Sequence, residues 1–468
     1  MHTLRRAIFC CALAILSSWA WGIAEGQEPA KPDTSQQKPP EAQVETGSVL
    51  GNDNERLVNR LSALLANHEF LEIEKALQVS DAGEGRGKLT PQQAQLFRGV
   101  LANRENKPEE SIRLLEPLLA KVKSTDHPPE EKILRKTLAE DYLRTSDWAK
   151  ANQAYLELEF RVGGKMTQDE RDEIELPVAL LPLAIANPQM TVEPGDSFAL
   201  PYDRDPLGLT DVPVFIDAQS HDWMLDPTAP FNLICRSTAK AIGLKVSEES
   251  ATVHSLTGRP MRVHMTVIPR FTLGTVTFRN MTAFVFEDAD YYFPKSDYQV
   301  RGVLGYPAVS ALGSLTITAD ARIEVQPGEK GARLTTGARF FLDGDRVIAA
   351  LGKPGDERMY SVDASGQQTY LTSRYYVEHS DDFANKKMQL LAVPGAAKKP
   401  PAPAYVADSV TLNAGDAPLT LHFVQVLTEP LNAAAIDDSY GVLGMDALDE
   451  LKSYTFDFRT MRFGVRSQ

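Results

Sequence analysis

An internal duplication limits the fold of this chain more than any other feature of its sequence. One copy contains the stretch WMLDPTAPFNLI, with Asp226 at the end of an apolar run, and the other contains YSVDASGQQTYL, with Asp363 in the same place. The letters GVLG then recur, ending at Gly305, 79 positions after Asp226, and at Gly444, 81 positions after Asp363. Because the order, the spacing and these four letters agree, we infer that one unit is present twice.

The residues after Pro188 have the pattern of a mainly β structure. Short alternating stretches such as VPVFIDA and SLTITADARIEV are separated by turn residues, which is typical of strands. A helix-like stretch and a β-rich stretch lie between the aspartate and the glycine of each copy. We therefore expect two β-rich units, one over residues 188–330 and the other over residues 331–468.

Residues 54–187 have the apolar period of helices. Two segments are alike: Gly99 and Ala139 stand where one helix must let another approach, and Ser111 and Ala151 repeat this twelve positions later. The pattern resembles tetratricopeptide repeats, although its spacing is near 40 rather than the usual 34. A short helical bundle is the alternative. Either structure would serve for packing or for binding a protein partner, since the segment carries no reactive cluster.

The chain begins with a pattern typical of an export signal. Residues 1–24 combine Arg5 and Arg6 with a short apolar run and small residues, which predicts a bacterial signal peptide and a periplasmic or extracellular protein. A membrane anchor is the alternative, but the run is shorter than the ~20 residues of a span. Residues 25–53, rich in Pro, Gln, Lys and Glu, predict a disordered linker. No later run is long enough to span a membrane, so no span is expected in the mature chain.

Composition excludes several classes of function. A net charge of −14 argues against a nucleic-acid partner. The eight histidines show neither the spacing of a zinc site nor a helical HExxH, so we expect no metal and no cofactor. Cys10 and Cys11 would leave with the signal peptide, and Cys235 alone cannot form an intramolecular disulfide.

Each copy of the duplication resembles a retropepsin-type aspartic peptidase unit, and the pair resembles a single-chain, two-lobed peptidase of the pepsin-like fold. The resemblance covers about Asp211–Val465 and rests on the strand-end aspartates and the repeated VLG. It implies that Asp226 and Asp363 are catalytic and that Thr257 and Gly258 lie in a flap. It also implies that two hydrophobic-Gly segments support the aspartate loops: Val303, Leu304, Gly305 and Val442, Leu443, Gly444.

The predicted fold is thus multidomain, with an α-helical, tetratricopeptide-like region followed by a mainly β, two-lobed, aspartic-peptidase-like unit. Such a unit needs one carboxylate from each lobe. Two carboxylates about 3 Å apart cannot both ionise, so they share one proton. The ionised member then activates a water, and the protonated member polarises the scissile carbonyl. Because the duplication supplies the symmetry within one chain, we expect a monomer that acts on a polypeptide.

The residues after the two aspartates depart from the family, which has Thr or Ser and then Gly. Pro227 and Thr228 follow the first aspartate, and Ala364 and Ser365 follow the second. Pro227 and Ala364 lack the hydroxyl that ties the two loops together, and Pro227 also lacks an N–H. Thr228 and Ser365 add a side chain where the backbone approaches closely, and their hydroxyls have the aspartates within reach as hydrogen-bond acceptors.

Two hypotheses of different class remain open from the sequence. The first is an exported aspartic endopeptidase that uses Asp226 and Asp363. The second is an inactive pseudo-peptidase, which binds a polypeptide in its cleft or acts as a scaffold together with the helical region. Retention of both aspartates favours the first hypothesis, and the two altered loops favour the second.

Overall fold

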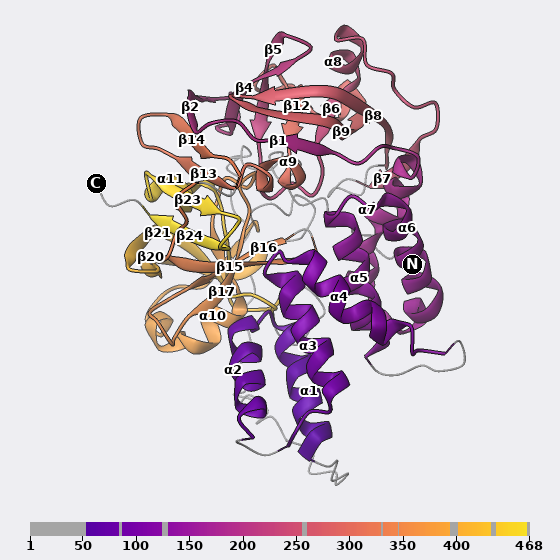
Figure 1. Ribbon diagram of the computed structural model, residues 1–468. Coiled ribbons are helices and arrows are strands. Elements are labelled where there is room, and N and C mark those ends of the chain that lie inside the picture. Colours follow the sequence, from indigo (N-terminus) through magenta and orange to yellow (C-terminus); the bar gives the residue numbers. More distant parts are fainter. Residues whose placement is uncertain are drawn as a thin grey trace.

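The chain is described from a computed structural model, which places residues 53–83, 87–123, 130–254, 260–328, 331–344, 346–393, 401–431 and 437–465. Within these ranges the helices α1–α7 come first and a mainly β region follows (Figure 1). The predicted change from helices to strands near residue 188 is confirmed. The predicted signal peptide and nearly all of the predicted linker lie outside the described residues.

The N-terminal helices are α1 Asp53–Ala66, α2 Phe70–Asp81, α3 Pro91–Arg104, α4 Pro108–Leu119, α5 Glu131–Arg144, α6 Trp148–Val162 and α7 Gln168–Ala184. Tight turns join α1 to α2, α3 to α4 and α5 to α6. The start of α3 is a capping box, in which the Thr90 side chain accepts from the Gln93 N–H and Gln93 reaches back to the Thr90 N–H. Thr167 and Glu170 start α7 in the same way. No helix among the described residues is both long and apolar enough to cross a membrane.

Three of the helical turns have the same backbone form. His68, Asn106 and Ser146 each adopt a positive φ, of 56°, 55° and 57°. In each case the next N–H reaches back to a helix carbonyl, as from Glu69 to Leu64 at 2.8 Å. Such a left-handed residue ends one helix and directs the chain into the next. The recurrence agrees with a helical repeat, while its assignment as tetratricopeptide-like stays a prediction.

Gly99 lies at a close crossing between α3 and α4, as its place in the sequence pattern predicts. A Cβ on Gly99 would be 2.3 Å from the Leu115 side chain. Ser111 and Ala151, at the second repeated position, are fully buried. Small side chains therefore set the distance between these helices.

Two large sheets make up the rest of the chain. The first has nine strands, with β3 (Asp203–Arg204) beside β4 and the others in the order β1 Thr191–Glu193, β9 Val276–Phe286, β6 Leu233–Cys235, β12 Gly302–Leu304, β5 Gln219–Leu225, β4 Thr210–Ile216, β8 Pro260–Leu273, β7 Ala251–His254. Strand β8 also pairs with β9, which closes part of this sheet into a ring.

The second sheet has thirteen strands, in the order β19 Gln389–Leu391, β20 Ala402–Ala414, β21 Ala417–Leu427, β18 Tyr370–Leu371, β22 Gly441–Leu443, β17 Arg358–Val362, β16 Arg346–Leu351, β15 Ala338–Asp343, β24 Arg462–Val465, β23 Tyr454–Asp457, β13 Ser314–Ile317, β14 Arg322–Gln326, β2 Phe198–Pro201. It therefore combines strands from both sides of residue 330.

The remaining elements are short. The helices are α8 Arg236–Ala241, α9 Tyr306–Ser310, α10 Ser373–Glu378 and α11 Met445–Glu450, and the strands are β10 Tyr292–Phe293 and β11 Tyr298–Gln299. Three 3-10 turns cover Gly163–Lys165, Asp288–Asp290 and Ser380–Phe383.

One three-strand arrangement occurs in both sheets. In the first sheet, β12 lies between β5, to which it is parallel, and β6, to which it is antiparallel. In the second sheet, β22 lies in the same way between β17 and β18. Each central strand carries the repeated GVL, and each parallel partner ends just before an aspartate. The two stretches that share a sequence order therefore also share the same pattern of strand pairing.

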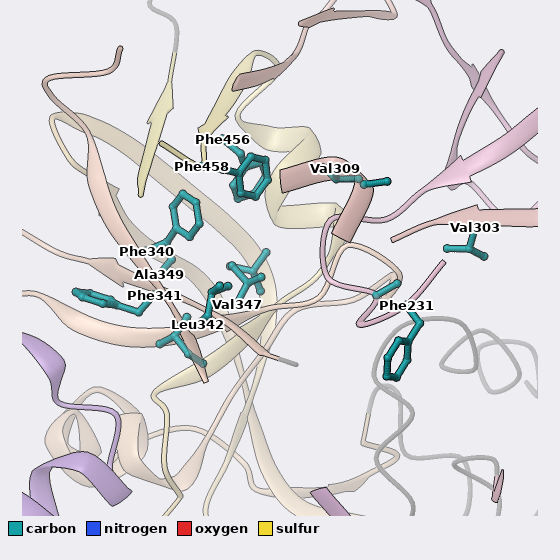
Figure 2. Packing of buried hydrophobic residues seen from close by; sticks show 14 of the residues in the cluster. Phe231, Val303, Val309, Phe340, Phe341, Leu342, Val347, Ala349, Phe456 and Phe458 are labelled. Atoms are coloured by element: carbon teal, nitrogen blue, oxygen red, sulfur yellow. The ribbon is translucent and has the colours of Figure 1, made fainter. Parts of the chain in front are cut away.

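An aromatic cluster joins the two sides of residue 330. Phe340 packs edge-on against Phe456 and Phe458, each with ring centroids 5.7 Å apart, and Figure 2 shows these three rings together. Tyr306, at the start of α9, packs edge-on against Phe458, with ring centroids 5.9 Å apart. The segment that follows Gly305 is therefore packed directly on the C-terminal strands.

The helices and the second sheet meet around a buried carboxylate. Asp343, at the end of β15, lies 2.8 Å from the Nε2 atom of His68 and 2.8 Å from the Nη2 atom of Arg104. The Nζ atom of Lys136 lies 3.8 Å away. Burial opposes ionisation of Asp343, but Arg104 and Lys136 outweigh it and hold the pKa of this carboxyl well below its usual range. Phe70 and Phe341 add an aromatic contact with centroids 5.1 Å apart.

Replacing Asp343 by alanine is expected to destabilise the whole protein. The change leaves the buried Arg104 without one of its two carboxylate partners, and breaking a buried ion pair costs about 3–5 kcal/mol. We expect the thermal midpoint to fall by several degrees. Asp408→Ala is the control, because Asp408 is exposed and its pair with Lys386 lies at the surface. Equal losses for the two variants would contradict a structural role for Asp343.

Candidate active site

The two aspartates are held by the same backbone contact. Asp226 follows β5, and its N–H donates to the carbonyl of Leu304 at 3.0 Å. Asp363 follows β17, and its N–H donates to the carbonyl of Leu443 at 2.9 Å. The two VLG segments thus contact the aspartate loops directly.

The residue two positions after each aspartate supplies two hydrogen bonds to it. Thr228 donates to the Oδ1 atom of Asp226 through its N–H at 2.8 Å and through its hydroxyl at 2.6 Å. Ser365 donates to the Oδ1 atom of Asp363 in the same way, at 3.0 and 2.7 Å. Neither Thr228 nor Ser365 has a positive φ, so the loops accept these side chains without the backbone strain that would require glycine.

One hydrogen bond links the two loops. The N–H of Ala364 donates to the Oγ1 atom of Thr228 at 3.3 Å. The Thr228 hydroxyl therefore accepts from one loop while it donates to the aspartate of its own loop. Pro227 has no N–H, so the equivalent bond in the other direction cannot form.

The two carboxyl groups differ in their surroundings. Asp226 is completely buried, whereas Asp363 is half-buried. The Oδ2 atom of Asp226 accepts no hydrogen bond from the described residues. Burial and the nearby Asp363 carboxylate raise the pKa of Asp226 to about 7, although the hydrogen bond from the Thr228 hydroxyl opposes this. Asp226 is therefore the carboxyl that keeps a proton in the folded chain up to neutral pH.

Gly366 was not expected as a site residue from the sequence. Its N–H donates to the Oδ1 atom of Asp363 at 3.0 Å, which gives this carboxylate a third donor. A Cβ at this position would lie 2.7 Å from the Oδ2 atom of Asp363, so a larger residue would displace this carboxylate. The signal that would have identified it is that Gly366 is the first glycine after Asp363, three positions on rather than two.

Other predicted positions lie elsewhere. Thr257 and Gly258 of the predicted flap fall in residues 255–259, outside the described residues. Cys235 is buried and contacts the Thr238 hydroxyl at 2.9 Å, which is the surrounding of a packed side chain. No group of three His, Cys, Asp or Glu side chains among the described residues is arranged to hold a metal ion.

Known proteins resemble part of this chain. The aspartyl protease family model matches residues 212–308, which contain Asp226 and Val303–Gly305 but not Asp363. A solved retropepsin-like aspartic protease from Rickettsia conorii is 16% identical, with 28% of this chain and 98% of that chain covered and a TM-score of 0.21. No curated protein matches the chain. The family match supports an aspartyl-protease-like unit around Asp226.

Proposed function

We propose that the protein is an aspartic endopeptidase in which Asp226 and Asp363 form one catalytic dyad across two related lobes. The observation that carries the proposal is the Thr228 hydroxyl, which binds Asp226 at 2.6 Å and receives the Ala364 N–H at 3.3 Å. In the sequence, both loops depart from the Thr/Ser-Gly pattern that follows the aspartate in the family. These contacts indicate that the loops have kept donors to both carboxylates and a bond between them.

The surroundings of the dyad favour different roles for its members. Asp226, buried and with a raised pKa, would carry the shared proton and donate it to the carbonyl oxygen of the substrate. Asp363, whose Oδ1 atom accepts from Ser365 and Gly366, would take a proton from the attacking water. The tetrahedral intermediate then collapses: Asp363 gives this proton to the leaving amine, the C–N bond breaks, and the hydroxyl formed from the carbonyl returns its proton to Asp226 as the C=O bond forms again. No covalent intermediate and no cofactor is needed.

An inactive, peptide-binding protein is the second candidate. The observation in its favour is Pro227, which removes one of the two bonds that would join the loops. Export through residues 1–24, action as a monomer and a protein partner at the helical region are further parts of the proposal that rest on the sequence. The three experiments below separate catalysis from binding alone.

Asparagine at either aspartate is expected to abolish cleavage. Asn cannot share a proton or act as a base, so Asp226→Asn and Asp363→Asn should each lower turnover of an unfolded protein by about 100-fold or more. The assay uses the purified chain between about pH 3 and 8, a range set by a carboxylate dyad. Background-level cleavage in all three proteins would overturn the peptidase proposal and favour the binding protein.

Thr228→Val is expected to lower kcat much more than it changes KM. Valine keeps the shape but removes both hydroxyl contacts, and misplacing a reacting group costs up to about 100-fold. Thr228→Ser keeps the hydroxyl and should restore most of the activity. Thr411→Val, whose hydroxyl contacts only Thr420 on an exposed part of the described sheet, is the control. If the serine variant were as slow as the valine variant, the hydroxyl would not be the important group.

The pH dependence follows from the raised pKa of Asp226. A dyad with one shared proton loses it as pH passes about 7, so kcat/KM should fall above that value. The same shift affects stability, because the neutral carboxyl is the form favoured by burial. The stability contributed by Asp226 is present below about pH 4 and is lost as pH rises towards 7. Thermal midpoints across this range should fall less in Asp226→Asn than in the wild type, and parallel curves would contradict the raised pKa.

A further inference from the structure

Each aspartate is followed six positions later by a buried polar side chain that the resemblance did not identify. These residues are Asn232 in the first copy and Thr369 in the second, and they are 3% and 4% exposed. The Oδ1 atom of Asn232 accepts from the N–H of Gly305 at 3.0 Å. The Oγ1 atom of Thr369 accepts from the N–H of Gly444 at 2.9 Å. Two different residue types thus make the same contact in the two copies.

This contact lies next to the one that holds the aspartate. The peptide before Gly444 carries the Leu443 carbonyl, which accepts from the Asp363 N–H at 2.9 Å. The peptide after Gly444 carries the Met445 N–H, which donates to the Gly366 carbonyl at 2.7 Å. A shift of Gly444 would therefore move both ends of the Asp363 loop. Leu304, Tyr306 and Ala229 make the matching contacts around Gly305.

The two glycines are closely packed. A Cβ on Gly305 would lie 2.3 Å from the Phe231 carbonyl oxygen, and a Cβ on Gly444 would lie 2.8 Å from the Gln368 backbone. Both glycines are buried, so an N–H that lost its acceptor would stay unsatisfied. The side chains of Asn232 and Thr369 therefore determine how firmly the VLG backbone is seated.

The two copies orient the accepting oxygen by different means. The Thr369 hydroxyl donates to the Oδ1 atom of Asp446 at 2.6 Å, so its proton points to Asp446 and a lone pair faces Gly444. The Thr369 N–H also donates to Asp446, at 2.9 Å. The first copy has Pro307 in the place of Asp446, and there the Nδ2 atom of Asn232 donates to the Thr282 carbonyl at 3.2 Å. In both copies a second bond fixes the acceptor.

We propose that Asn232 and Thr369 are positioning residues for the catalytic aspartates, each acting through the glycine of its VLG segment. The inference rests on the proposed peptidase function for its effect on turnover. Its structural part, the coupling of residue 369 to the Asp363 backbone and of residue 232 to the Asp226 backbone, does not depend on catalysis.

Amide hydrogen exchange on the full chain tests the coupling. Thr369→Val keeps the shape of the side chain but removes the acceptor, and exchange at the Gly444 and Asp363 amides should become at least about 10-fold faster, the effect of ~1.4 kcal/mol from one lost hydrogen bond. The Gly305 and Asp226 amides are the internal control and should not change. Asn232→Leu should give the reverse pattern, and Thr369→Ser should exchange like the wild type.

Kinetics on the same proteins test the consequence for catalysis. Thr369→Val should lower kcat by about 10- to 100-fold with KM nearly unchanged, and Thr369→Ser should restore it. Unchanged exchange at Asp363, or equal acceleration at the amides of both copies, would overturn the proposal. Exchange that changes as expected in a protein whose cleavage is insensitive to Asp226→Asn and Asp363→Asn would support the coupling and reject the peptidase function instead.

Discussion

The site depends on one hydroxyl. A hydroxyl has one proton and two lone pairs, and Thr228 uses the proton for Asp226 and a lone pair for the Ala364 N–H. In the family that the sequence resembles, the hydroxyl that ties the loops together lies one position earlier, where this chain has Pro227. Moving the hydroxyl along the loop lets the chain hold its carboxylate and keep contact between the loops. The altered sequence and the retained geometry are therefore compatible.

The helical region is bound to the β region by charge as well as by apolar packing. His68 and Arg104 both face the Asp343 carboxylate, and Arg374 pairs with Glu69 near the first turn. Burying an ion is unfavourable unless it has a partner of opposite charge. Separating the helices from the β region would break these pairs and is therefore costly. The helical side chains that meet Asp343 are occupied by the chain itself. A protein partner of the helices would have to bind elsewhere on them.

Much of the site could be predicted because its pattern is local and repeated. The aspartates, the two VLG segments and the change to strands near residue 188 are read from order and spacing alone. The role of the Thr228 hydroxyl could not be predicted, because its partner Ala364 lies 136 positions away in the sequence. Asn232 and Thr369 were missed because the two copies use different residue types for one contact. The sheet that crosses residue 330 depends on pairings such as β13 with β23, which no local pattern encodes.

The two aspartate loops differ in sequence, and this difference places their carboxyls in different surroundings. Identical loops would place both aspartates in identical surroundings, and the shared proton would have no preferred site. Here Asp226 is fully buried, whereas Asp363 is half-buried and its Oδ1 atom accepts from both Ser365 and Gly366. Burial favours the neutral acid and additional donors favour the carboxylate. These different surroundings are the physical basis for giving the two carboxyls different roles in the proposed dyad.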